Sequence, residues 1–150
     1  VISSTKIRNL VSSGSITEAN ALLGYEYQLY GVVVSGNRLG HTIGFPTANM
    51  QLYEPLKLVP GRGVYLVKVE TLGKSWNGMC NIGVRPTLGA GNAMTIETNI
   101  FGFNEDIYGL DMRLSFVRKI RDEVKFGDFS LLAGQLDKDR RQCLDILGVE

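Results

Sequence analysis

Hydrophobic and polar residues alternate along much of the chain between residues 27 and 121, as they do in strands with one buried face. Gly, Pro and Asn separate these segments, and no helical pattern comes between them. Several such strands without intervening helices predict a mainly β fold, either an antiparallel barrel or a sandwich. The clearest strand segments are residues 64–70, 76–82, 94–101 and 111–120.

The same pattern predicts a turn and a buried face. Gly73-Lys74-Ser75 lies between the first two segments and indicates a hairpin turn. The last segment is expected to bury one face, although Arg118 interrupts its apolar positions. These positions are Met112, Leu114, Phe116 and Ile120.

A helical period replaces the alternation after Asp128, which is a favourable N-cap residue. Apolar residues then recur at helical spacing, and the stripe lapses around Asp139 and Arg140. An amphipathic helix is therefore expected to close the domain, with the charged residues 137–141 forming its solvated face. The apolar stripe consists of Phe129, Leu132, Leu136, Cys143 and Leu147.

Two short helices are predicted before residue 25. Ser4 is expected to cap the first, which Gly14 ends, and a capping box of Ser15 and Glu18 opens the second, which stops at Gly24. We therefore expect linker helices over residues 1–24 and one folded domain over residues 25–150.

Composition narrows the function classes. The 150 residues carry a formal net charge of +1, which favours neither a nucleic-acid partner nor an anionic membrane. No apolar run approaches the ~18 residues that span a bilayer, and no signal segment opens the chain, so a cytoplasmic protein is expected. Cys80 and Cys143 lack metal-ligand spacing and lie in apolar stretches, which favours buried free thiols.

The strongest chemical signal is a glycine-rich segment that ends in a Thr-x-Asn pair. Gly36, Gly40 and Gly44 allow close approach of the backbone to phosphate, and Pro46 leads into Thr47 and Asn49. A hydroxyl and an amide oxygen are oxygen ligands of the kind that Mg²⁺ accepts beside substrate phosphates. The alternative is a glycine-rich hairpin corner in which the two polar side chains satisfy a turn.

Glu97 is the carboxylate to single out, because it lies in the middle of a predicted strand. An acid at such a position usually has a partner or a chemical task. A solvent-facing strand acid is the alternative.

Four ordered motifs resemble the riboflavin kinase (flavokinase) family, in particular the kinase module of bacterial bifunctional FAD synthetases. The motifs span residues 44–49, 81–87, 96–101 with Tyr108-Gly109, and 120–126, and the resemblance covers about residues 25–147. It implies a six-stranded antiparallel split barrel with Greek-key connections. It also implies that ATP and Mg²⁺ convert riboflavin to FMN, with ADP as the other product. His41 and Asn99 depart from the family pattern.

The resemblance also implies residue roles. Glu97 is the expected base for the primary hydroxyl of the ribityl chain, and Thr47 and Asn49 are the expected magnesium ligands. Nucleotide contacts are expected from Gly36, Gly40, Gly44, Pro46, Thr47 and Asn49. Flavin contacts are expected from Arg121 and Glu123.

Residues 3–8 resemble the closing motif of the adenylyltransferase module in bifunctional FAD synthetases. This resemblance implies that the kinase domain is natively fused to an N-terminal FMN adenylyltransferase module. The rival function is a non-catalytic flavin- or nucleotide-binding barrel, which needs neither metal ligands nor a base.

Overall fold

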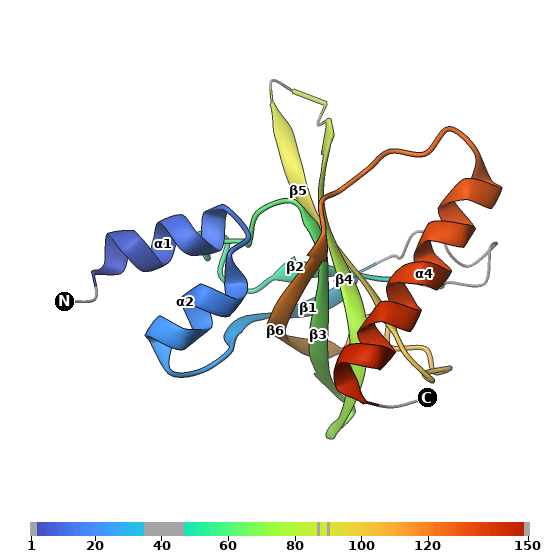
Figure 1. The fold of residues 1–150 in the computed structure, drawn as a ribbon, viewed down its shortest axis with the longest axis horizontal. Helices are drawn as coiled ribbons and strands as arrows, with labels where there is room; N and C mark the ends of the chain where they lie inside the picture. The colour runs from blue at the N-terminus through green and yellow to red at the C-terminus, as the bar shows by residue number, and fades with distance from the viewer. Residues whose placement is uncertain (1–2, 35–46, 87, 90, 149–150) are drawn as a thin grey trace.

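The structure is a computed structural model that describes residues 3–34, 47–86, 88–89 and 91–148. Figure 1 shows a β-barrel with two short helices on one side and a longer helix on the other. The helices are α1 (Ser4–Ser12), α2 (Ile16–Leu23) and α4 (Phe129–Leu147). The strands are β1 (Tyr27–Val34), β2 (Ala48–Leu52), β3 (Gly63–Thr71), β4 (Lys74–Pro86), β5 (Asn92–Ile100) and β6 (Asp111–Arg121).

The strands pair antiparallel and close into a barrel in the order β1-β2-β5-β4-β3-β6. The predicted mainly β, six-stranded antiparallel barrel is therefore confirmed. The β3–β4 hairpin has Leu72 and Gly73 at its corner, both with positive φ, as a type I′ turn requires. The turn thus lies one residue earlier than the predicted Gly73-Lys74-Ser75.

The barrel interior holds the main hydrophobic core, in which the Tyr65 and Phe116 rings meet edge to face at 5.3 Å. A second core lies between α4 and the barrel, where Leu66 and Met79 pack with Cys143. Both cysteines are buried and free, as predicted, and burial raises the pKa of each thiol to about 12.

Ile120 does not share the face of Phe116, so that prediction is wrong. The pairing of β6 with β3 shifts register between Val64 and Tyr65 and again between Leu66 and Val67. An extra residue in one strand reverses the alternation beyond it. As a result Ile120 packs in the second core with α4, while Phe116 stays inside the barrel.

Asp128 caps α4 as predicted, because its carboxylate accepts a hydrogen bond from the Ser130 N–H at 2.7 Å. The predicted solvated face of residues 137–141 is wrong for Asp139, which is only 1% exposed. Its carboxylate pairs with Arg121 at 2.8 Å and accepts a hydrogen bond from the Gln135 amide at the same distance. The lapse in the apolar stripe is therefore a buried ion pair.

The N-terminal helices form as predicted, with different caps. Ser3, not Ser4, caps α1 by accepting a hydrogen bond from the Lys6 N–H, and the helix ends at Ser12, before Gly14. Ser15 makes no side-chain cap bond, so the predicted capping box does not form. The α2 residue Asn20 donates to the Phe116 carbonyl on β6, which ties the helix pair to the barrel.

Candidate functional site

One row of side chains crosses the outer face of the barrel through the predicted site. Asn49 on β2 pairs with Glu97 on β5, and Glu97 pairs with Asn81 on β4. The row continues through Val64 on β3 to Arg121 on β6. Directly opposed residues in antiparallel strands project from the same face, so these five side chains lie side by side.

The core residues show that this row faces outward. Ile96 and Ile82 adjoin Glu97 and Asn81 along their strands, and both belong to the interior core. Val64 and Asp139 lie on the side of α4, where Arg121 is held. The row therefore joins a polar half, on β2, β5 and β4, to a half that α4 covers.

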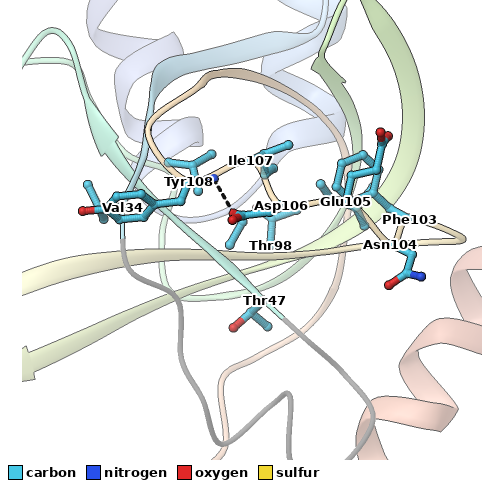
Figure 2. Close-up of a pocket in the computed structure, with 12 residues that line it drawn as sticks. Val34, Thr47, Thr98, Phe103, Asn104, Glu105, Asp106, Ile107 and Tyr108 are labelled. Atoms are coloured by element: carbon cyan, nitrogen blue, oxygen red, sulfur yellow. Dashed lines mark hydrogen bonds between the residues drawn. The ribbon is translucent and has the colours of Figure 1, made fainter.

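Thr47 precedes β2 and lines a cavity of about 390 Å³ at the neighbouring end of the barrel. Figure 2 shows Thr47 across this cavity from the segment between β5 and β6, where the Tyr108 N–H donates to the Asp106 carboxylate. Val34, at the end of β1, also lines this cavity. The remaining lining residues include Thr98, Ile100, Phe103, Asn104, Glu105 and Ile107.

A larger cavity of about 1040 Å³ contains Asn49 and Glu97. Arg85 and Thr95 add polar groups to its wall, and its apolar lining includes Met50, Leu52, Leu56, Leu58 and Met94. Val34 lines both cavities. Thr47 and Asn49 are thus brought to adjoining cavities that meet beside β1 and β2.

The glycine-rich segment is not part of the described structure. Gly36, Gly40, Gly44 and Pro46 all lie outside the described residues. Val34 and Thr47, the described residues on either side of this segment, both line the smaller cavity. The predicted nucleotide contacts of the glycines and of Pro46 therefore remain predictions.

The residues beside the two cavities fit a magnesium ion that shares its coordination with phosphate. Thr47 Oγ1 is buried and has no hydrogen-bond partner among the residues described. Asn49 adds an amide oxygen next to the Glu97 carboxylate in the β2–β5 register. Within the described residues no cluster of three or more His, Cys, Asp and Glu forms a metal site. A sparse set of neutral oxygen ligands beside substrate phosphates is typical of Mg²⁺ rather than of a caged metal.

Arg121 lies at the far end of the row and is engaged by protein groups. Its Nε donates to both carboxylate oxygens of Asp139 at 2.9 and 3.0 Å, and its guanidinium also donates to the Asp122 carbonyl. Two strands, β4 and β3, thus lie between Glu97 on β5 and Arg121 on β6, although both residues belong to one row.

Glu123 lies closer to the larger cavity. Its carboxylate accepts a hydrogen bond from the Arg62 guanidinium at 2.6 Å. A Cβ added to Gly83 would come within 2.3 Å of Glu123 Oε2 and 3.0 Å of Thr95 Oγ1. Because Thr95 lines the larger cavity, the Glu123 carboxylate lies at the border of that cavity.

Sequence reasoning missed two parts of the site. Asn81 opens a recognised motif, yet only the strand register shows that it stands beside Glu97. The segment from Phe103 to Ile107 forms a wall of the smaller cavity, and its loop composition gave no sign of this. Register and loop placement depend on contacts between segments far apart in the chain.

A closed antiparallel barrel with a hydroxyl, an amide and a carboxylate at the junction of two cavities is typical of a small-molecule enzyme. The sequence model of the Flavokinase family, described as riboflavin kinase, matches residues 23–147. The chain belongs to the riboflavin kinase family, whose reaction converts riboflavin to FMN.

Curated relatives agree with this assignment. A protein of Bacillus subtilis is 41% identical over 145 residues, covering 95% of this chain and 46% of the relative. A protein of Haemophilus influenzae is 43% identical over 139 residues, covering 92% of this chain and 44% of the relative. Both are named bifunctional riboflavin kinase/FMN adenylyltransferase. The chain spans just under half the length of these relatives.

Two solved structures are also similar. A riboflavin kinase from Trypanosoma brucei has a TM-score of 0.54 and 25% identity, with 81% of this chain and 79% of that chain covered. A Streptococcus pneumoniae chain called a macrolide-efflux protein has a TM-score of 0.87 and 40% identity, with 93% and 45% covered. Within the described part of the present chain, no helix is long and apolar enough to cross a membrane.

Proposed function

We propose that the outer-face row and the two cavities transfer the γ-phosphoryl group of ATP to the 5′-hydroxyl of riboflavin. The observation that carries this proposal is the register of Asn49 beside Glu97, where the larger cavity adjoins the one that Thr47 lines. Phosphoryl transfer needs a nucleotide, a hydroxyl and a base to meet at one point. The junction of the cavities offers such a point.

The two substrates are assigned to the cavities by their linings. Val34 and Thr47, which flank the glycine-rich segment in the sequence, line the smaller cavity, so this cavity is assigned to the nucleotide. The larger cavity has an apolar wall with a few polar groups, which suits a flavin ring and its hydroxylated chain. The terminal hydroxyl of that chain then lies beside Glu97.

Glu97 acts as the general base. The hydroxyl oxygen of riboflavin forms a bond to the γ-phosphorus, and the bond from this phosphorus to the β–γ bridging oxygen breaks. The electron pair of the broken bond leaves with ADP, and the hydroxyl proton passes to the Glu97 carboxylate. A positioned base of this kind contributes about 10²–10⁴ in rate.

Thr47 and Asn49 would hold Mg²⁺ together with phosphate oxygens. When bound, the ion supplies positive charge that offsets the charge of the phosphates. The buried Thr47 hydroxyl, which has no partner among the described residues, supports this role.

Arg121 and Glu123 act on the flavin side. Glu123 borders the larger cavity through Thr95, which supports a direct contact with the flavin. The ion pair of Arg121 with Asp139 joins the end of β6 to α4. This pair holds the start of the connecting residues 122–128 against the helix. The contribution of Arg121 to flavin binding is therefore to orient Glu123.

We further propose that the kinase domain works in the cytoplasm and as part of a longer protein with an FMN adenylyltransferase module. The supporting observation is that relatives with that name are about twice as long as this chain. In such a protein, FMN made by this domain is the substrate of the other module.

The test is to incubate the purified chain with riboflavin, ATP and Mg²⁺ and to separate the flavins by chromatography. We expect FMN and ADP in equal amounts, and no product when Mg²⁺ is omitted. Saturable binding of riboflavin and ATP without any FMN would instead support the rival, a non-catalytic flavin- or nucleotide-binding barrel.

A further inference from the structure

Asn81 stands next to the proposed base in the cross-strand row. It is the β4 partner of Glu97, while Asn49 is the β2 partner. Strands in a sheet are about 4.8 Å apart, so the side chain of Asn81 is a direct neighbour of the carboxylate.

The side chain of Asn81 carries an unused acceptor. Asn81 Oδ1 is buried and has no hydrogen-bond partner among the residues that the structure describes. The backbone of Asn81 lies in the ladders of β4 with β3 and with β5, so strand formation does not need this amide. Asn is also disfavoured in strands. A buried acceptor without a donor is destabilising, which indicates that a ligand supplies the donor.

The order of groups along the row identifies the donor. Beginning at β2, the row contains Asn49 on the phosphate side, then Glu97, and then Asn81. The flavin-side carboxylate of Glu123 lies against Gly83, which is two residues from Asn81 on the same face of β4. Riboflavin has the same order of groups: the reacting primary hydroxyl, then secondary hydroxyls on successive carbons, then the ring.

We propose that Asn81 Oδ1 accepts a hydrogen bond from a secondary hydroxyl of the ribityl chain, next to the hydroxyl that is phosphorylated. This inference rests on the proposed function, because that function sets the direction of riboflavin along the row. The strand spacing of about 4.8 Å limits the partner to the 4′- or the 3′-hydroxyl. Asn81 thereby selects a polyol chain and holds its end against Glu97.

The test compares riboflavin with its 4′-deoxy and 3′-deoxy analogues, using wild-type protein, Asn81→Ala and Asn77→Ala. Asn77 is a matched control, since it lies four residues away on the same strand and the same face. We expect Asn81→Ala to lower kcat/KM for riboflavin about tenfold, mainly through KM. With one of the two analogues, Asn81→Ala and wild-type protein should have the same kcat/KM, because the hydroxyl that Asn81 would bind is missing. Asn77→Ala should behave like wild type with every substrate.

The proposal is overturned if Asn81→Ala has the same deficit with riboflavin and with both analogues, or no deficit at all. Thermal melts show whether the variant folds. If the variant does not fold, the test uses wild-type protein only. The contact then predicts that kcat/KM of wild-type protein is about tenfold higher for riboflavin than for one of the two analogues. Equal use of all three substrates then contradicts the contact.

A binding measurement separates this inference from the proposed function. Riboflavin and the analogues are titrated against Glu97→Gln protein, with or without the additional Asn81→Ala change, and flavin fluorescence is followed. Loss of affinity that depends on one hydroxyl supports the Asn81 contact even where no FMN is formed. If wild-type protein makes FMN but binds riboflavin and both analogues with the same affinity, the proposed function stands and the Asn81 contact is wrong.

Discussion

The outer face of the barrel has two halves that differ in how their polar groups are satisfied. Beneath α4 the face is apolar where Leu66 on β3, Met79 on β4 and Ile120 on β6 pack against the helix. The buried carboxylate of Asp139, on α4 itself, has Arg121 and Gln135 as partners. On β2, β5 and β4 the row of Asn49, Glu97 and Asn81 is polar, and Asn49 and Glu97 line the larger cavity. In the half under α4, protein groups satisfy the buried carboxylate. In the polar half, Asn81 Oδ1 is buried and has no hydrogen-bond partner among the described residues, and the same holds for Thr47 Oγ1 just before β2.

This difference indicates which residues should matter mainly for folding stability and which should matter mainly for binding and turnover. A buried polar group that is fully hydrogen-bonded fixes one arrangement, because losing a partner is costly. Thr47 Oγ1 has no partner among the described residues, and under the proposed function a ligand supplies one. Changes in the α4 half should therefore alter folding, while changes in the polar half should alter binding and turnover.

The largest effect is expected from Glu97→Gln. The amide keeps the shape of the side chain but cannot accept the hydroxyl proton, so we predict a loss of about 10²–10⁴ in kcat with ADP binding retained. Single-turnover formation of FMN measures the chemical step, and equilibrium dialysis with ADP measures binding.

Glu70→Gln is the matched control for this variant. Glu70 is an exposed strand glutamate on β3, two positions from Lys68, and lines neither cavity of the candidate site. It should retain normal turnover. Near-normal turnover of Glu97→Gln would assign Glu97 a structural role and remove the functional contrast between the two halves.

Asp139→Asn should produce the largest loss of stability. Removing one charge of a buried pair leaves Arg121 without its counter-ion, and we expect the free energy of unfolding to fall by about 3 kcal/mol. Urea denaturation measures this change. Asp137→Asn on the same helix is the control, because the Asp137–Arg141 pair is exposed and should contribute less than about 1 kcal/mol. Equal effects of the two changes would show that burial of Asp139 is unimportant.

The sequence predicted the barrel strands well, because alternation directly reflects a face buried in the core. It failed at Ile120, where a register shift between β3 and β6 reverses the alternation, and at Asp139, where a charge in an apolar stripe was interpreted as exposed. Both depend on a partner far away in the chain: β3 for Ile120 and Arg121 for Asp139. Charge pattern alone cannot show such a partner.

The candidate site was predictable to a similar extent. Glu97 stood out as an acid within a strand, and the register places it beside Asn49, which the sequence had selected independently. The neighbouring Asn81 could not be selected, since an Asn in a strand-like segment becomes informative only once its cross-strand partner is known. Long-range register therefore supplies the part of the site that local pattern lacks.

A smaller, cooperative effect is expected at Thr47 and Asn49. Each change to Ala should weaken binding of magnesium-ATP about tenfold, and the double variant should be little worse than either single variant, since both remove the same metal contact. Titration calorimetry of ATP with and without Mg²⁺ measures this directly. Full additivity of the two losses would indicate that the residues do not share one ion.

The smallest effect is expected at Asp128, which caps α4. Hydrogen bonds from the Ser130 hydroxyl and N–H lower the pKa of this carboxyl below its usual value of about 3.8. A carboxyl with a lowered pKa in the folded state stabilises the fold above its unfolded pKa, and that stabilisation is lost as pH falls through the folded value. Asp128→Ala should therefore lower the urea midpoint at pH 7 and differ less from wild type near pH 3. Asp128→Asn retains an acceptor for the Ser130 N–H and should lose less stability at pH 7, with little dependence on pH. A loss in Asp128→Ala that is the same at both pH values would show that the charge of Asp128 does not contribute to the cap.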